Sequence, residues 1–357
     1  MLEKREREKK LTLQQNIIWN TVGMSFYLGC QWLITILVVR LSSDFTNSGY
    51  LTLSMSVTNI FYAIASYNMR AYQISDVTGK YPDRVYLQIR TVTCGISILL
   101  CVLYSFAFYR DERWSAILLY MIFRVVEGII DILQGFDQRA MRMDIIGKSM
   151  FMRGALNVLS FSGTIILTDS FQLAVLAMIV VSVLIMVCYD IPWASRFGKL
   201  KGKFEGNMVK QLLMECLLMG IASALSTSIV SIPRTWLDYL YGQEQLGIYG
   251  ALSSPTVLIQ VAATYLFNPM LSVYAEYYVQ KEKDNFSRLF KQTLLALCGL
   301  SILALFAAWI LQDYLLPLLL GESIRPYIYM FIPILGCTIL NAIVWLLTNL
   351  LVVIRGI

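Results

Sequence analysis

Residues 171–191 read FQLAVLAMIVVSVLIMVCYDI, an apolar run with a single charged side chain, Asp190. A helix of about 20 mostly apolar residues is long enough to cross the hydrocarbon core of a bilayer. Segments of this kind recur along the chain between short polar loops. The sequence therefore predicts an all-α, polytopic membrane helix bundle with ten spans, at 16–41, 48–69, 87–109, 114–134, 149–168, 171–191, 208–232, 247–272, 289–311 and 326–353.

The composition agrees with this class. Of 357 residues, 57% are hydrophobic and 15% are charged, whereas a soluble domain carries about a quarter charged residues. A soluble protein with this many apolar helices would need far more polar surface than the sequence offers. A transmembrane β-barrel is built from strands of about 10 residues with alternating polarity, and the apolar runs here are longer and do not alternate.

The basic residues predict the orientation, because Lys and Arg concentrate in cytoplasmic loops. Of the 29 Lys and Arg residues, 23 lie on one predicted side, in loops or at the adjoining span ends, among them Arg90 and Arg153. Five lie on the other side, and Arg124 lies inside a span. We therefore expect a cytoplasmic N-terminus in a cytoplasmic membrane. Glutamates interleave with the basic residues before the first span, which favours a topology signal over a nucleic-acid or lipid patch.

The residues needed for most catalytic chemistry are missing from the sequence. It has no histidine, and its seven cysteines all fall inside predicted spans without metal-ligand spacing. Histidine is the commonest metal ligand and general base. The predicted outer loops are too short for a catalytic domain, which disfavours a membrane-embedded polymerase or transferase. We expect a transporter, not an enzyme, with no metal and no cofactor.

A weak internal repeat divides the chain. The sequences SGYLTLS at 48–54 and LGIYGALS at 246–253 each open a predicted span, and their glycines, Gly49 and Gly247, are 198 positions apart. An offset of six spans gives two halves of the same orientation, a parallel repeat. This predicts an N-terminal lobe at 1–205 with six helices and a partial C-terminal lobe at 206–357 with four. Chance similarity between two span starts is the alternative.

Three segments resemble the polysaccharide-repeat-unit flippases, which are O-antigen and capsule exporters of the multidrug/oligosaccharidyl-lipid/polysaccharide (MOP) superfamily. They are IPRTWLDYLYGQEQLGIYGALSSP at 232–255, RAYQISDVTGKYPDRVYLQIR at 70–90, and the polar positions of 124–153. The resemblance implies a MATE-like fold and export of an undecaprenyl-pyrophosphate-linked oligosaccharide by alternating access, for lipopolysaccharide or capsule synthesis. It also implies membrane lipids, a polysaccharide polymerase and other assembly proteins as partners, and two further spans beyond ten.

A multidrug or metabolite cation antiporter of the same superfamily is the alternative function. Such a protein should have a more apolar cavity with acidic cation sites. Basic residues facing inward, Arg124 and Arg234 in particular, would favour the flippase. The sequence does not identify the sugar or the coupling ion.

The charges within the predicted fourth span are the main functional candidates, because an ionisable group at the bilayer centre costs roughly 2.5–3.5 kcal/mol on insertion scales. At about 100° per residue, Arg124, Glu127 and Asp131 share one helical stripe with Tyr120 and Gln134. One hypothesis is a cavity lining, in which Arg124 binds the pyrophosphate and Glu127 and Asp131 take part in coupling. The other is a structural Arg124–Glu127 pair.

Further candidates lie at the ends of other spans. Arg40 and Arg234 end the first and seventh spans at roughly repeat-related places and would form a cationic mouth for the substrate; alternatively they reach lipid headgroups. Asn20 lies in the first span, where it would contact sugar or bond a neighbouring helix.

Overall fold

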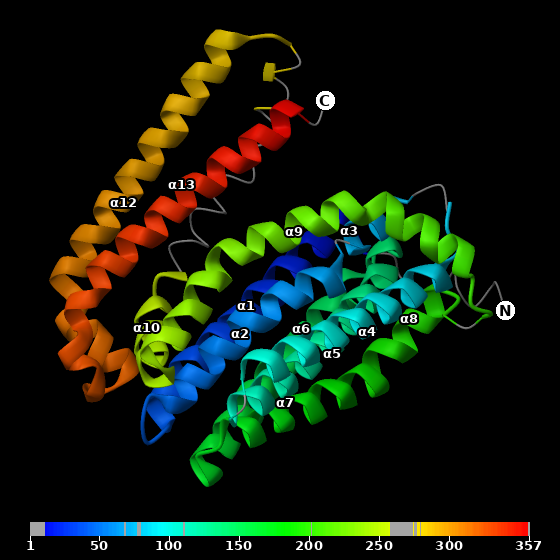
Figure 1. Ribbon diagram of the computed structural model, residues 1–357. Coiled ribbons are helices and arrows are strands. Elements are labelled where there is room, and N and C mark those ends of the chain that lie inside the picture. The colour runs from blue at the N-terminus through cyan, green and yellow to red at the C-terminus, as the bar shows by residue number, and fades with distance from the viewer. Residues whose placement is uncertain are drawn as a thin grey trace. The chain divides into compact units, whose positions relative to one another are not determined.

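The computed structural model describes residues 11–67, 69–76, 80–109, 111–200, 202–257, 274, 277–278 and 280–355, and regular structure within these ranges is entirely helical (Figure 1). By its contacts the chain forms two units, Met1–Gly247 and Ile248–Ile357. The first unit contains α1 (Leu13–Leu41), α2 (Thr46–Ser66), α3 (Met69–Ser75), α4 (Asp83–Phe108), α5 (Arg113–Arg139), α6 (Met143–Thr168), α7 (Phe171–Ile185), η1 (Met186–Asp190), α8 (Ile191–Phe197) and α9 (Gly206–Tyr241).

The helices have the lengths and polarity of membrane spans. Among the described residues, 6 helices are long and apolar enough to cross a bilayer, or 7 if α9, which bends by 48°, counts as one span. This confirms the predicted all-α membrane bundle. The helices α2 and α5 are also long but are not among these candidates. Helix α2 has many small polar residues, and α5 carries charged ones, Arg124, Glu127 and Asp131 among them. The count of ten spans stays a prediction, because most of 247–272 lies outside the described residues.

Helix α2 contacts α1, α4, α5, α7 and α9, so it is surrounded by other helices of the first unit. Its buried residues include many small polar ones, namely Asn47, Ser48, Thr52, Ser54, Ser56 and Thr58. Several of their hydroxyls donate to the carbonyl one turn earlier in the same helix, as Thr52 does to Ser48 at 2.8 Å. Side chains satisfied in this way let a polar helix occupy the centre of a membrane bundle.

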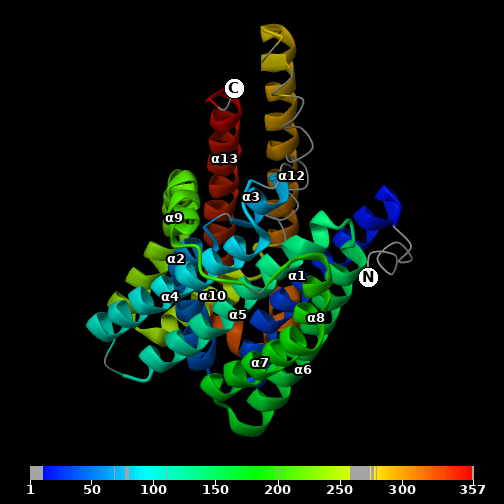
Figure 2. The same cartoon turned by 90° about the vertical axis from the view of Figure 1, so that its right-hand side faces the viewer.

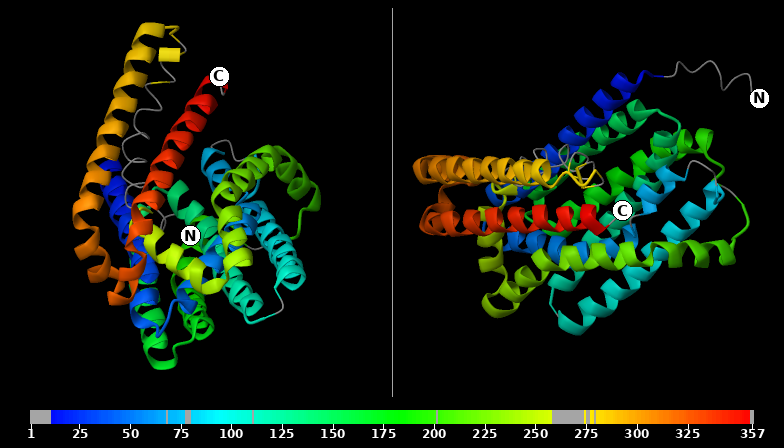
Figure 3. Two further views of the ribbon diagram at one scale, coloured as in Figure 1. Left: turned by 60° about the vertical axis from the view of Figure 1, so that its left-hand side comes forward. Right: turned by 90° about the horizontal axis from the view of Figure 1, so that it is seen from above.

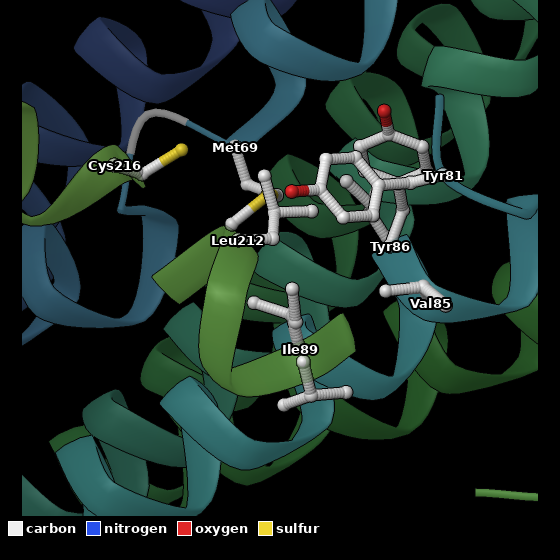
Figure 4. Close-up of a cluster of buried hydrophobic side chains, with 9 residues drawn as sticks. Met69, Tyr81, Val85, Tyr86, Ile89, Leu212 and Cys216 are labelled. Atoms are coloured by element: carbon white, nitrogen blue, oxygen red, sulfur yellow. The ribbon is translucent and has the colours of Figure 1, made fainter. Parts of the chain in front are cut away.

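Helix α9 belongs to the first unit because it packs on α2 and α4. A buried cluster joins the segment 69–89 to the start of α9 (Figure 4); its members are Met69, Tyr81, Val85, Tyr86, Ile89, Ile132, Val209, Leu212 and Cys216. Beside it, Glu215 accepts hydrogen bonds from Tyr72 at 2.6 Å and Tyr81 at 2.9 Å. It also forms an ion pair with Lys80 at 2.7 Å. The bond to Glu215 raises the pKa of Tyr72 to about 12, so this hydroxyl remains a donor at neutral pH.

The second unit contains α12 (Lys283–Leu320), η2 (Glu322–Met330) and α13 (Phe331–Arg355), and α10 (Gln243–Ser253) crosses the boundary between the units. Helices α12 and α13 lie side by side (Figure 3). Tyr274, Leu297, Ala342 and Leu346 form their shared core. The boundary after Gly247 separates two groups of residues that contact one another within each group. It does not test the boundary of the sequence repeat at 205/206, which stays a prediction.

Helices α1 and α6 pack closely against each other in the first unit. A β-carbon added at Gly23 would lie 2.6 Å from the Cα of Gly147, and one added at Gly147 would lie 2.7 Å from the carbonyl oxygen of Trp19. Glycine at these positions therefore lets the two backbones touch, as small residues do at membrane helix interfaces.

Replacing Gly147 with valine is expected to destabilise the protein by about 1–3 kcal/mol, as overpacking does elsewhere. Gly163 lies in the same helix but has no heavy atom within 4 Å of an added β-carbon, so Gly163→Val is the matched control. Thermal unfolding of the detergent-purified proteins measures the effect. Equal melting temperatures for the two variants would contradict the close α1–α6 contact.

Candidate functional site

The candidate site is built along α5, which contacts α2, α3, α4, α6, α7 and α8 and lies among them in Figure 2. The polar stripe predicted from the sequence is present, with Tyr120 and Gln134 buried. Its three charged residues, however, turn to three different sets of neighbours.

Arg124 lies near the middle of α5 and is partly buried. Its guanidinium stacks on the ring of Tyr62 from α2, with 3.9 Å between the Cζ atom and the ring centroid. Its Nε atom is buried and has no hydrogen-bond partner among the described residues, and no ion pair of Arg124 is found there either. A cation–π contact holds the plane of the guanidinium while leaving its N–H edge available for an anion.

Glu127, with an exposed fraction of 8%, does not pair with Arg124. Its Oε2 atom accepts a hydrogen bond from the Tyr27 hydroxyl of α1 at 2.6 Å and lies 2.6 Å from Nη1 of Arg153 in α6. The hypothesis of a self-neutralising Arg124–Glu127 pair is therefore wrong. Arg153 itself is only 3% exposed and lies within α6 (Met143–Thr168), so it is packed inside the bundle; its predicted place toward the cytoplasmic side stays a prediction.

Asp131 joins three elements. Its carboxylate lies 2.8 Å from Arg70 of α3 and 2.9 Å from Arg90 of α4. Arg90 is 1% exposed and also donates to the carbonyl oxygen of Ala65 at 2.8 Å. Two cations on one carboxylate favour a structural role for Asp131, and its part in coupling stays a prediction.

Two further carboxylates are fully buried in the same unit. Asp137 in α5 and Asp190 in η1 are both 0% exposed, and Asp190 lies near the side chains of Ser149 and Gln134. Asp190 is within electrostatic range of Arg153 and Glu127. It closes a π-helical turn, a distortion that occurs frequently at functional sites. Asp190 is not among the site residues predicted from the sequence.

The remaining candidates are spread over α1 and α9. Arg40 is exposed at the end of α1, and Arg234 is partly buried in α9 directly after Pro233. Asn20 is half-buried in α1, one turn after Asn16. The Asn16 side chain accepts a hydrogen bond from the backbone N–H of Met143 at 2.9 Å. The roles of Arg40, Arg234 and Asn20 in substrate binding stay predictions.

Comparison with known proteins finds solved structures with a similar fold and a curated protein of low sequence identity. No protein-family model matches the sequence. The chain is 19% identical over 296 residues to the capsular polysaccharide biosynthesis protein CapF of Staphylococcus aureus, covering 82% of this chain and 74% of that protein.

Solved transporter structures share the architecture. One is an inward-facing MATE-family multidrug resistance transporter of the MOP superfamily, with a TM-score of 0.61 at 11% identity over 94% of this chain and 87% of that one. Another is the Vibrio cholerae MATE transporter VcmN in its bent form, with a TM-score of 0.51 at 14% identity over 96% and 85%. The chain is therefore a multi-pass membrane protein with the fold of the MATE transporters of the MOP superfamily.

Proposed function

We propose that the protein moves a lipid-linked oligosaccharide, carried on undecaprenyl pyrophosphate, from the inner to the outer leaflet of the cytoplasmic membrane. Its N-terminus would be cytoplasmic, and its product would feed surface polysaccharide synthesis together with a polymerase and other assembly proteins. The observation that carries the proposal is Arg124, a cation in the middle of a bundle helix that forms no ion pair within the described part of the chain. The similarity to CapF, a capsular polysaccharide biosynthesis protein, supports a role in polysaccharide synthesis.

The physical problem is the pyrophosphate. Its charge must pass about 30 Å of hydrocarbon, and desolvating an unpaired charge is very costly. A fixed arginine in a watery path lowers that cost, and its planar fork binds two phosphate oxygens while staying charged at every relevant pH. Arg40 and Arg234 would extend the cationic path toward the outer end, and Asn20 would bind sugar hydroxyls. The lipid tail remains in the bilayer.

The buried Glu127 is the coupling residue in this proposal. Its Oε1 atom has no hydrogen-bond partner among the described residues, which leaves one acceptor oxygen of the carboxylate for a proton or a competing cation. Protonation would weaken its ion pair with Arg153 and loosen the junction of α5 with α1 and α6. Asp190 lies within electrostatic range of the same pair and would respond to this change.

A multidrug or metabolite cation antiporter is the competing function, because the solved structures that share the fold include multidrug resistance transporters. One experiment separates the two. The gene is expressed in a capsule-producing cell whose own flippase is deleted, and separately in a drug-sensitive cell without its main exporters. We expect restored surface polysaccharide and unchanged drug resistance. Increased drug resistance without surface polysaccharide would replace the flippase with the antiporter.

A further inference from the structure

The two repeat-related glycines, Gly49 and Gly247, lie against each other in the structure. A β-carbon added at Gly247 would lie 2.9 Å from the backbone nitrogen of Gly49 and would clash with the carbonyl oxygen of Phe45. A β-carbon added at Gly49 would clash with the carbonyl oxygen of Gln243 and lie 2.6 Å from its Cγ. Both glycines are buried. Only glycine allows the starts of α2 and α10 to approach this closely.

These contacts are reciprocal. Gln243 follows Phe45 by the same 198 positions that separate Gly247 from Gly49. Gly49 therefore touches the repeat mate of Phe45, and Gly247 touches Phe45 itself. Two segments related by a two-fold axis contact each other through equivalent residues, as these two do. This local two-fold relation supports the repeat and argues against chance similarity between the two sequence segments.

Two hydrogen bonds accompany the fit of the glycines at this contact. Ser48 Oγ donates to the carbonyl oxygen of Gly247 at 3.1 Å, and Gln243 Nε2 donates to the carbonyl oxygen of Thr46 at 3.1 Å. Both are neutral hydrogen bonds. Gly242, which separates α9 from α10, has a φ of +85°, a conformation that favours glycine. The contact is thus tight, uncharged and adjacent to a turn where the chain direction changes.

We propose that Gly49 and Gly247 form a seal at the outer end of the transport path, which must close and separate in each cycle. The predicted orientation, in which α2 and α10 begin outside, places this seal at the outer end. That the path carries a transported substrate rests on the proposed function. Because the seal is made of backbone contacts, side-chain bulk at either glycine would hold it open. A closed seal keeps ions and water from crossing while the substrate site faces the cytoplasm.

The first test replaces each glycine with valine. Gly49→Val and Gly247→Val are expected to abolish export of surface polysaccharide while the protein stays in the membrane at its normal level. Gly29→Val and Gly95→Val are the matched controls, because nothing lies within 4 Å of a β-carbon added at Gly29 or Gly95. Normal export by both seal variants would overturn the proposal.

The second test measures opening directly and needs no substrate. Ser54 follows Gly49 along α2, on the side away from the start of the helix, and is 0% exposed. In a chain whose seven native cysteines are replaced, Ser54→Cys should resist a membrane-impermeant maleimide added outside. Adding Gly49→Val should make it reactive, and adding Gly29→Val should not. Equal protection in all three proteins would overturn the seal. Opening without any export by the parent protein would instead reject the flippase function and leave the seal standing.

A third measurement covers the case in which the valine variants do not accumulate. Thr46→Cys and Gln243→Cys place two half-exposed thiols across the contact in the same cysteine-free chain. A short bifunctional maleimide should join them and stop export, whereas each single cysteine treated in the same way should remain active. Full export after complete cross-linking would show that the contact does not separate during transport, and the proposal would fail.

Discussion

Replacing Arg124 with alanine is expected to abolish export of surface polysaccharide while leaving the amount of membrane-inserted protein unchanged. The guanidinium forms no ion pair among the described residues and rests on the Tyr62 ring, so its removal leaves no buried acid without a partner. What is lost is a charge-assisted contact with the pyrophosphate. Such contacts contribute about 1.5–3 kcal/mol, which corresponds to a fall in rate of roughly ten- to a hundredfold.

Two further variants define the chemistry. Arg124→Lys should restore export only in part, because a point charge cannot bind two phosphate oxygens with the geometry of the planar fork. Arg139→Ala is the control on the same helix, since Arg139 is exposed and forms its ion pair with Asp83 at 3.0 Å. Surface polysaccharide is measured in a cell without its own flippase, with the protein level measured in parallel. Normal export by Arg124→Ala would reject the role, and loss of the protein itself would make Arg124 structural.

The class of fold follows from the sequence because membrane insertion depends on local hydropathy. The apolar runs at 87–109 and 171–191 correspond to α4 and to the continuous α7, η1 and α8. Even the polar helices α2 and α5 were predicted, since the runs between their polar residues remain apolar. The repeat at Gly49 and Gly247 was visible as a pattern, but only the structure shows that the two glycines meet.

The partners of the charged residues could not be predicted in the same way. A helical wheel places Arg124 and Glu127 about 60° apart, and that rotation is enough to turn one toward Tyr62 in α2 and the other toward Tyr27 and Arg153. The sequence reading began the fifth span at residue 149, whereas α6 begins at Met143. The earlier start leaves Arg153 flanked by helix on both sides, where neighbouring helices bury it.

Asp190 was missed for a related reason. Position along the sequence suggested a span end near water, but the chain continues as helix through η1 and α8 to Phe197. The carboxylate is therefore fully buried. Burial depends on which helices pack around a residue, and the order of helices in space is not encoded in the hydropathy of any one of them.

The pair of Glu127 and Arg153 gives the second prediction with a large effect. Removing one partner of a buried ion pair leaves an uncompensated charge and costs about 3–5 kcal/mol. Both side chains are nearly inaccessible, at 8% and 3% exposure. Arg153→Met should therefore lower the melting temperature of the detergent-purified protein sharply. Glu127→Gln should do so less, because its amide retains the contact with the Tyr27 hydroxyl.

The double variant separates structure from coupling. Glu127→Gln combined with Arg153→Met removes both charges and keeps the volumes similar, so its stability should return close to that of the parent, since uncharged replacements of buried pairs are often tolerated. If Glu127 carries the coupling charge, the double variant should remain unable to export polysaccharide although it is stable. If the pair only holds α5 to α6, export should recover together with the melting temperature. A stable and active double variant would therefore remove Glu127 from the coupling mechanism and leave Asp190, which lies beside the same pair, as the buried carboxylate to be tested next.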